Sequence, residues 1–531
     1  MCGSILVLAC IRNYAFYWDG VAYAWQVENS PFSDIFHQHH LIFTPFCKII
    51  YIALISSGLQ VRSLGVMVGV NIVFGLIYLY LCHEIIRRIF PNPRWLAPLG
   101  ILLIAFSYTF GTFWRNVDAY IIPLTIITII ILRIIPKDSG VFRAGIYEWI
   151  LLFIAILFHQ ISALLLPALI FAQWETPSRR RVLSLIINLA LLTISLAGVY
   201  LLVFYLMSPH LTRPSFFEWI SGYAKDSDHT WWIFNRIHGF FNIMFVSFQQ
   251  SMLSHKFLFI SSIKPSIWWG EDKIVIGNYK IYFGLSWFIF TLFILAIVYG
   301  IKNQISDSRT RKLVWLLLVY IAPYIIFFQF YCPKASLFRM FYFLPLVIFI
   351  LAGIKAYIKT RFHKITGLIF LLMFIGINFV FGFIPESFPS SNTYLNDAKA
   401  IREQTTKRDL FIFSPHRDSH TFQSRVYLQY FGDRDVIILG NYPVWLLKAM
   451  TPEELKNACG ESRRWFIQNY DNFYFNIVKN KPEDFIKMTP FVKSRDIPDQ
   501  LILQMKQIHY LSVIKLNVYV FHKGEIREYG K

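Results

Sequence analysis

The chain has 531 residues, of which 56% are hydrophobic, with a formal net charge of +20 and a mean hydropathy of +0.48. This composition excludes a single soluble domain. The basic residues lie mainly in short loops between apolar runs, which argues against nucleic acid as a partner. The six cysteines have no paired spacing, so neither a disulfide framework nor a zinc site is expected.

A short apolar run over residues 4–15 opens the chain and leads into a polar first loop, residues 15–63. The loop is rich in aromatic residues and contains three acids and three histidines: Asp19, Glu28, Asp34, His37, His39 and His40. A polar loop of this kind is costly to hold beside a bilayer, so we expect it to be functional. The alternative is a solvated connector with histidines on its surface.

Further apolar runs predict membrane-spanning helices. They cover residues 64–89, 95–113, 119–132, 146–158, 161–172, 182–206, 281–299, 313–330, 341–351 and 365–384. We expect about eleven spans including the first run. The two short runs that meet at His159-Gln160 are predicted to form a hairpin, and one continuous span is the alternative. A long mixed loop, residues 207–280, carries Trp, His and Asp in the pattern of a membrane interface.

The distribution of Lys and Arg predicts the orientation. Seventeen of them lie in five loops assigned to the cytoplasm, namely residues 83–94, 133–143, 173–181, 301–312 and 355–364. Only five lie in the short loops of the opposite face, residues 15–63, 114–118, 159–160 and 331–340. By the positive-inside rule the N-terminus is cytoplasmic and the C-terminus is outside.

The last part of the chain, residues 385–531, is charged and differs from the apolar part, residues 1–384. Short β-like runs (LFIFSP, DVIILG, RWFIQN and KLNVYVFH) alternate with helical stretches, which predicts a small extracytoplasmic α/β domain. Neither a Walker A loop nor a dinucleotide-binding glycine fingerprint is present, so a nucleotide-driven pump is not supported.

The order of these features resembles the GT-C fold glycosyltransferases, including the protein O-mannosyltransferases and the bacterial aminoarabinose transferases. Three phrases carry the resemblance: HQHHLIFTPF in the first loop, WRNVDAYIIPLT in the second and PKASLFRMFYFLPL in a late one. The chain has Arg339-Met340-Phe341-Tyr342 where those proteins have an Arg-Tyr pair. The resemblance implies a multi-span bacterial enzyme that transfers a sugar from a polyprenyl-phosphate carrier to a lipid, glycan or protein.

Two carboxylates are the candidate catalytic groups. Transfer of a sugar to a hydroxyl needs a base, and Asp19, just after the first apolar run, is our candidate. The alternative for Asp19 is a helix cap. Asp118, at the outer end of a predicted span, assists the base, orients the acceptor or binds a metal. The alternative for Asp118 is a salt bridge to Arg115, which is itself a candidate substrate-binding residue.

The candidate donor-binding residues are basic. Arg339 matches phosphate oxygens bidentately, Lys334 is a second candidate, and snorkelling to the interface is the alternative for Arg339. His39 and His40 hydrogen-bond the donor phosphate or ligate a divalent metal ion. No other cofactor is expected, and the expected partners are the donor, the acceptor and membrane lipid.

Two other functions remain open. One is a polysaccharide polymerase or ligase, which relies on arginines of the outer face rather than on an acid of the first loop. The other is a transporter of lipid-linked glycans, which shows symmetric halves and charges at the membrane midplane. In this chain the polar groups collect on one face, which favours the transferase. The expected location is the bacterial inner membrane, with residues 385–531 in the periplasm.

Overall fold

The structure, a computed structural model, divides into two compact units. Unit 1 comprises residues 1–15, 31–207 and 216–388, and unit 2 comprises residues 16–30, 208–215 and 389–531. Most of the long loop expected over residues 207–280 lies outside the described residues. These are residues 2–136, 142, 144–174, 179–207, 215–217, 219–220, 251–253, 280–306, 308–331, 336–358, 360–413, 419–438, 472–477, 506–511 and 516–522.

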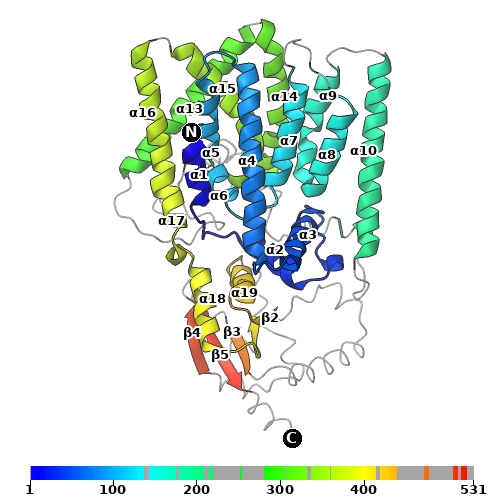
Figure 1. The fold of residues 1–531 in the computed structure, drawn as a ribbon, viewed down its shortest axis with the longest axis vertical. Coiled ribbons are helices and arrows are strands. Elements are labelled where there is room, and N and C mark those ends of the chain that lie inside the picture. The colour runs from blue at the N-terminus through cyan, green and yellow to red at the C-terminus, as the bar shows by residue number, and fades with distance from the viewer. Residues whose placement is uncertain are drawn as a thin grey trace. The chain divides into compact units, whose positions relative to one another are not determined.

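Unit 1 is helical in its described residues, and its long helices run side by side (Figure 1). Its elements in chain order are α1 (Cys2–Cys10), η1 (Phe32–Asp34), α3 (Phe43–Ser56), α4 (Ser63–Ile89), α5 (Leu96–Ala105), α6 (Tyr108–Phe113), α7 (Ile121–Ile134), α8 (Ile146–Phe158), η2 (Gln160–Leu165), α9 (Leu166–Trp174), α10 (Arg179–Leu206), α13 (Lys280–Ser306), α14 (Ser308–Phe330), η4 (Ser336–Tyr342), α15 (Phe343–Tyr357), α16 (Arg361–Asn378), the π-helical turn η5 (Phe379–Phe383) and α17 (Ile384–Glu386).

Five helices of the described residues are long and apolar enough to cross a membrane: Ser63–Ile89, Arg181–Leu206, Trp287–Ser306, Thr310–Phe330 and Leu337–Tyr357. Six shorter apolar helices accompany them. The chain is therefore an integral membrane protein, as the sequence predicts. Helix α15 is almost wholly buried, whereas α10 is mostly exposed and lies at one flank of the unit (Figure 1). The total of about eleven spans stays a prediction.

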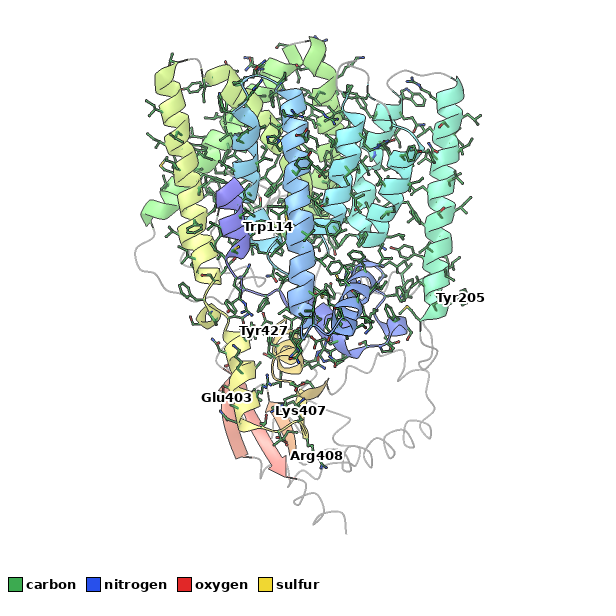
Figure 2. The ribbon with its side chains drawn as sticks, in the orientation of Figure 1. Trp114, Tyr205, Glu403, Lys407, Arg408 and Tyr427 are labelled. Atoms are coloured by element: carbon green, nitrogen blue, oxygen red, sulfur yellow. The ribbon has the colours of Figure 1, made fainter. Side chains whose placement is uncertain are left out.

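Small residues allow close packing at two places in unit 1. A Cβ on Gly300 of α13 would lie 2.0 Å from the Phe349 oxygen of α15, and one on Gly353 of α15 would lie 2.2 Å from the Ala296 oxygen of α13. The two backbones thus touch, in the small-residue packing common between membrane helices. The second place is at Trp114, which Figure 2 labels. It packs against Gly75 of α4, where a Cβ would lie 2.7 Å from the indole ring.

Unit 2 contains helices and a mixed sheet. Its elements are α2 (Trp18–Asn29), η6 (Pro389–Ser391), α18 (Thr393–Gln404), β1 (Asp409–Phe413), α19 (Ser419–Tyr430), β2 (Asp435–Ile438), β3 (Asn472–Ile477), β4 (Lys506–Leu511) and β5 (Leu516–His522). The strand order is β2-β1-β3-β5-β4, with β1 parallel to β2 and β3 and with β5 antiparallel to β3 and β4. Strands β1, β2 and β5 occur at three of the expected β-like runs, and RWFIQN lies outside the described residues.

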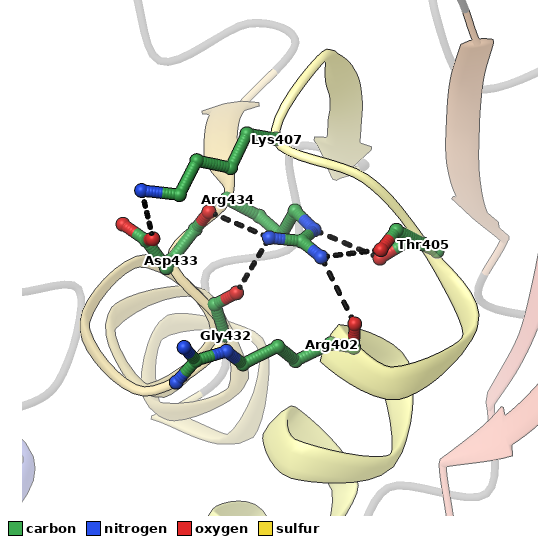
Figure 3. A network of polar contacts seen from close by, with 6 residues as sticks. All are labelled: Arg402, Thr405, Lys407, Gly432, Asp433 and Arg434. Carbon is green, nitrogen blue, oxygen red and sulfur yellow. Dashed lines mark hydrogen bonds and ion pairs between the residues drawn. The ribbon is translucent and has the colours of Figure 1, made fainter.

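A buried arginine fixes the connection between α18 and β2 (Figure 3). The guanidinium of Arg434 donates to the carbonyl oxygens of Arg402, Thr405, Gly432 and Asp433 and to the Thr405 hydroxyl, at 2.5 to 3.0 Å. Arg402 and Thr405 lie at the end of α18, and Gly432 and Asp433 follow α19. One side chain thus pairs with carbonyls at the end of α18 and in the loop between α19 and β2.

Candidate functional site

The histidines of the first loop form a compact cluster with a fourth histidine from elsewhere in unit 1. The rings of His37 and His40 stack at 4.2 Å with an interplanar angle of 5°, and His39 lies 5.4 Å from His37. His159, which separates α8 from η2, lies 6.2 Å from His40. The first loop is therefore folded onto the break between the two short helices.

Gln160 holds this arrangement in place. Its backbone N–H donates to the His39 carbonyl at 2.9 Å, and its side-chain oxygen lies 3.2 Å from Nδ1 of His39. The side-chain amide donates to the Gln38 carbonyl at 2.7 Å and to the Tyr200 hydroxyl of α10 at 3.0 Å. Backbone and side-chain bonds thus fix the position of the His39 ring.

The cluster is neutral at physiological pH. Burial lowers the pKa of His37 to about 3, and the nearby His39 lowers it further. Burial also places the pKa of His40 and of His159 well below the ordinary value, with the other histidines adding to the effect. For His39 burial lowers the pKa, and the hydrogen bond to Gln160 opposes this. A neutral imidazole can donate one hydrogen bond to an anion and accept another.

Tyr120 connects this cluster to the late segment that contains Arg339. Its ring lies 4.6 Å from His159, 5.6 Å from Phe338 and 5.9 Å from Phe341. Arg339, in η4 between those two phenylalanines, is fully buried. Its guanidinium lies 5.6 Å from the Phe328 ring of α14 and interacts with the Tyr342 hydroxyl. The structure thus brings together the first loop, the second loop and η4.

Asp118 lies two residues before Tyr120 and is buried. An irregular segment over residues 114–118, which begins with a turn at residues 114–115, carries it, and the side-chain amide of Asn71 in α4 donates to the carbonyls of Asn116 and Asp118, at 2.7 and 2.9 Å. Asn116 in turn donates to the Ala15 carbonyl at 2.7 Å. Asp118 is therefore held in a segment whose backbone carbonyls are hydrogen-bonded by a side chain of α4.

Arg115 is buried in this segment, but among the described residues no ion pair joins it to Asp118. Its guanidinium donates to the carbonyls of Gly111 at 2.6 Å and Ile11 at 3.1 Å. Burial lowers the pKa of Arg115 to about 10, although the nearby carboxylate of Glu386 opposes the shift. Arg115 therefore remains a cation at neutral pH.

Glu386 is a buried acid that our sequence reasoning did not single out. Its carboxylate accepts hydrogen bonds from Tyr108 at 2.8 Å, from Thr112 at 3.0 Å and from Asn13 at 3.4 Å. Three separate segments, the end of the last apolar run, α6 and the residues after α1, meet at this one carboxylate. The signal in the sequence was a single acid directly after an apolar run, which is costly unless it is paired.

The remaining candidates lie elsewhere. Asp19 is in the first turn of α2 in unit 2, and burial raises its pKa to about 8. The same helix carries Glu28, which accepts a hydrogen bond from Tyr430 of α19 at 3.2 Å. Lys334 lies outside the described residues. Among those that the structure describes, no three His, Cys, Asp or Glu residues are grouped so that they could hold a metal ion.

The fold is that of the multi-span membrane proteins of GT-C type, as the sequence predicts. It is shared with ArnT from Cupriavidus metallidurans in the apo state, with a TM-score of 0.54, 11% sequence identity and coverage of 99% of this chain and 97% of that one. The same protein bound to undecaprenyl phosphate also gives 0.54 and 11%, with coverage of 98% and 97%.

A third similar structure is the archaeal oligosaccharyltransferase AglB from Archaeoglobus fulgidus in complex with an inhibitory peptide and a dolichol-phosphate. Its TM-score is 0.47 with 13% identity, and the match covers 92% of this chain and 71% of that chain. No protein-family model and no curated protein sequence matches this chain. The likeness to ArnT, at 11% identity, establishes the fold alone.

Proposed function

We propose that this protein is an integral-membrane glycosyltransferase that moves a sugar from a polyprenyl-phosphate carrier to an acceptor on the outer face of the membrane. The observation that carries the proposal is the continuous contact from His40 through His159 and Tyr120 to the segment of Arg339. The fold shared with ArnT, which has been crystallised with undecaprenyl phosphate, supports a lipid-phosphate donor.

Arg339 is the proposed contact of the donor phosphate. Its planar guanidinium presents paired donors to phosphate oxygens and stays charged when buried. His39 and His40 are neutral and are proposed to supply single N–H donors, and Arg115 and Lys334 are proposed to add positive charge. These groups stabilise the charge that develops on the departing phosphate.

The reaction needs a carboxylate that accepts the proton of the acceptor hydroxyl. In the proposed step the hydroxyl oxygen forms a bond to the anomeric carbon, the bond from that carbon to the phosphate oxygen breaks, and polyprenyl phosphate leaves with the bonding electrons. Asp19 is the proposed base; with a pKa of about 8 it accepts the proton in its ionised form, and the ionised fraction grows as the pH rises. Asp118 is proposed to orient the acceptor.

The proposal leaves room for a divalent metal ion at the histidines. Neutral imidazoles are suitable ligands in principle, but the described residues do not group three ligands together, so no step is assigned to a metal. We place the protein in a bacterial inner membrane, with the C-terminal domain in the periplasm.

The test is transfer by the purified, reconstituted protein. Proteoliposomes receive a radiolabelled sugar on polyprenyl phosphate, and label is followed into lipid, glycan and protein fractions of the host envelope. A parallel sample receives the matching nucleotide sugar. We expect label transfer from the lipid-linked donor alone. Transfer from the nucleotide sugar alone, or movement of intact donor across the bilayer without transfer, would overturn the proposal.

A further inference from the structure

The segment over residues 106–118, which includes the second loop, is largely irregular backbone buried inside a membrane protein. Residues 106–118 contain the six-residue helix α6 and two turns, and almost all of their side chains are buried. Irregular backbone is stable at such a place only when its polar groups find partners within the protein. The hydrogen-bond donors that pair with the carbonyl groups of this segment therefore determine its conformation.

Three buried asparagines supply those donors from outside the segment. Asn378 of α16 donates to the Phe106 carbonyl at 2.7 Å, and Asn13 donates to the Thr112 carbonyl at 3.3 Å. Asn71 of α4 donates to the carbonyls of Asn116 and Asp118. Of the three, Asn71 acts at the part of the segment that carries Asp118.

The geometry points to Asn71 as the positioning residue of the Asp118 carboxylate, and we propose this role for it. Its two bonds fix the carbonyls on both sides of Val117, so they fix two peptide planes and with them the direction of the Asp118 side chain. Only the NH₂ end of an amide can face two carbonyl oxygens, because an oxygen there would be repelled. The inference rests on the proposed function of Asp118.

Burial of Asn71 agrees with this role. The side chain is fully buried in α4, a helix long and apolar enough to cross a membrane, where an amide is costly unless it is hydrogen-bonded. An apolar residue would suit such a helix better on packing grounds alone. Thr128 of α7 provides the contrast, because this buried hydroxyl bonds only to the Leu124 carbonyl of its own helix.

The first experiment measures transfer kinetics in proteoliposomes. Asn71→Leu should lower kcat about 10- to 100-fold, because a displacement of about 1 Å at a reacting group has an effect of this size. The KM for the donor should change little, since Arg339, the proposed contact of the donor phosphate, lies on another segment. Asn71→Gln keeps both N–H donors and should recover part of the loss. Thr128→Val is the matched control and should be close to wild type.

A double-mutant cycle separates positioning from a general structural effect. If Asn71 acts through Asp118, then Asn71→Leu should lower kcat little further in an Asp118→Asn background. Full additivity of the two effects, or a kcat of folded Asn71→Leu equal to that of Thr128→Val, would overturn the inference. Size-exclusion elution and thermal stability in detergent establish that each variant is folded.

A labelling experiment tests the inference without relying on the sugar-transfer reaction. Asp118→Cys should react slowly with a water-soluble maleimide, and at least about 10-fold faster when Asn71→Leu is added, because the segment is then released. The unaltered chain, with its own six cysteines, is the blank. Equal labelling rates would refute the role of Asn71 even if transfer is observed. Faster labelling in a protein that transfers no sugar would instead refute the proposed function alone.

Discussion

Asp19 and Asp118 are both acids beside apolar runs in the sequence, but their surroundings differ. Asp118 belongs to unit 1 and lies in a segment held by Asn71, whereas Asp19 belongs to the first turn of α2 in unit 2. Burial raises the pKa of Asp19 to about 8, so this carboxyl retains its proton near neutral pH. The raised pKa of Asp19 therefore predicts that any role of this acid depends on pH in the neutral to alkaline range.

The first prediction concerns the pH dependence of transfer. If Asp19 is the base, the rate should rise with pH as this group ionises, with a midpoint near pH 8. Asp19→Asn should remove this rise and lower transfer at least about 100-fold. Initial rates in proteoliposomes between pH 5.5 and 9.5 provide the measurement. Near-normal transfer by Asp19→Asn would make Asp118 the leading candidate.

The raised pKa of Asp19 also makes the stability of the folded protein depend on pH. The folded protein holds the Asp19 proton up to about pH 8, whereas an unfolded chain loses it near pH 3.8. The folded state therefore binds more protons between these values, and this residue's contribution to stability falls as the pH rises through that window. Thermal unfolding of wild type and Asp19→Asn at pH 5 and pH 9 measures it, and the variant should lose less stability at high pH.

The second prediction concerns Arg339. Because Lys lacks the planar pair of donors, Arg339→Lys should impair use of the donor despite its unchanged charge, and Arg339→Ala should be worse. We expect at least about a 10-fold loss in kcat/KM for the lysine variant. Arg87→Lys is the control, since Arg87 pairs with Glu84 on an exposed part of α4. Wild-type transfer by both Arg339 variants would exclude a phosphate contact.

At the scale of elements, the crossing of α13 and α15 depends on glycine. A methyl group at Gly353 would overlap the Ala296 carbonyl, and backbone cannot move aside as a flexible side chain can. Gly300 of α13 is needed for the same reason, because a Cβ there would overlap the Phe349 carbonyl of α15. Close contact of these two helices is what allows α15 to be almost wholly buried.

The third prediction tests this crossing. Gly353→Ala should destabilise the protein by about 1–3 kcal/mol, since the two helices must separate. Gly376→Ala in α16 is the matched control, because a Cβ there has nothing within 4 Å and alanine favours helix. The midpoint of thermal unfolding in detergent distinguishes the two variants. Equal midpoints would show that the crossing tolerates a methyl group.

At the scale of the whole molecule, the fold is established by the likeness to ArnT, while its orientation in the membrane rests on charge. Seventeen basic residues in the loops of one face and five in those of the other predict that the C-terminal domain is outside. The domain's sheet and the Arg434 contacts describe a folded unit, whichever side it occupies.

The fourth prediction is therefore topological. Lys407→Cys places a thiol at a side chain that is 76% exposed, and an impermeant maleimide should label it in spheroplasts. Arg87→Cys, at a side chain that is 64% exposed in a predicted cytoplasmic loop, should react only after permeabilisation. The reverse pattern would invert the orientation and place residues 385–531 in the cytoplasm.

The sequence by itself determined the features that depend on local composition. Apolar length predicts membrane helices, so the runs that became α4, α10 and α14 were recognisable, and short β-like apolar runs identified β1 and β2. The histidine loop was recognisable as well, because His37, His39 and His40 are adjacent in the chain. Each of these sequence signals lies within a stretch of some twenty consecutive residues.

Only the tertiary structure decided which distant residues meet. Tyr108 bonds Glu386 across 278 positions, and Asn71 reaches Asp118 across 47. In the sequence each of these residues is a single polar side chain in or beside an apolar run. The neighbouring residues do not indicate which group it will pair with. The partners are chosen because a buried polar group must be hydrogen-bonded, and packing of the helices determines which groups are within reach.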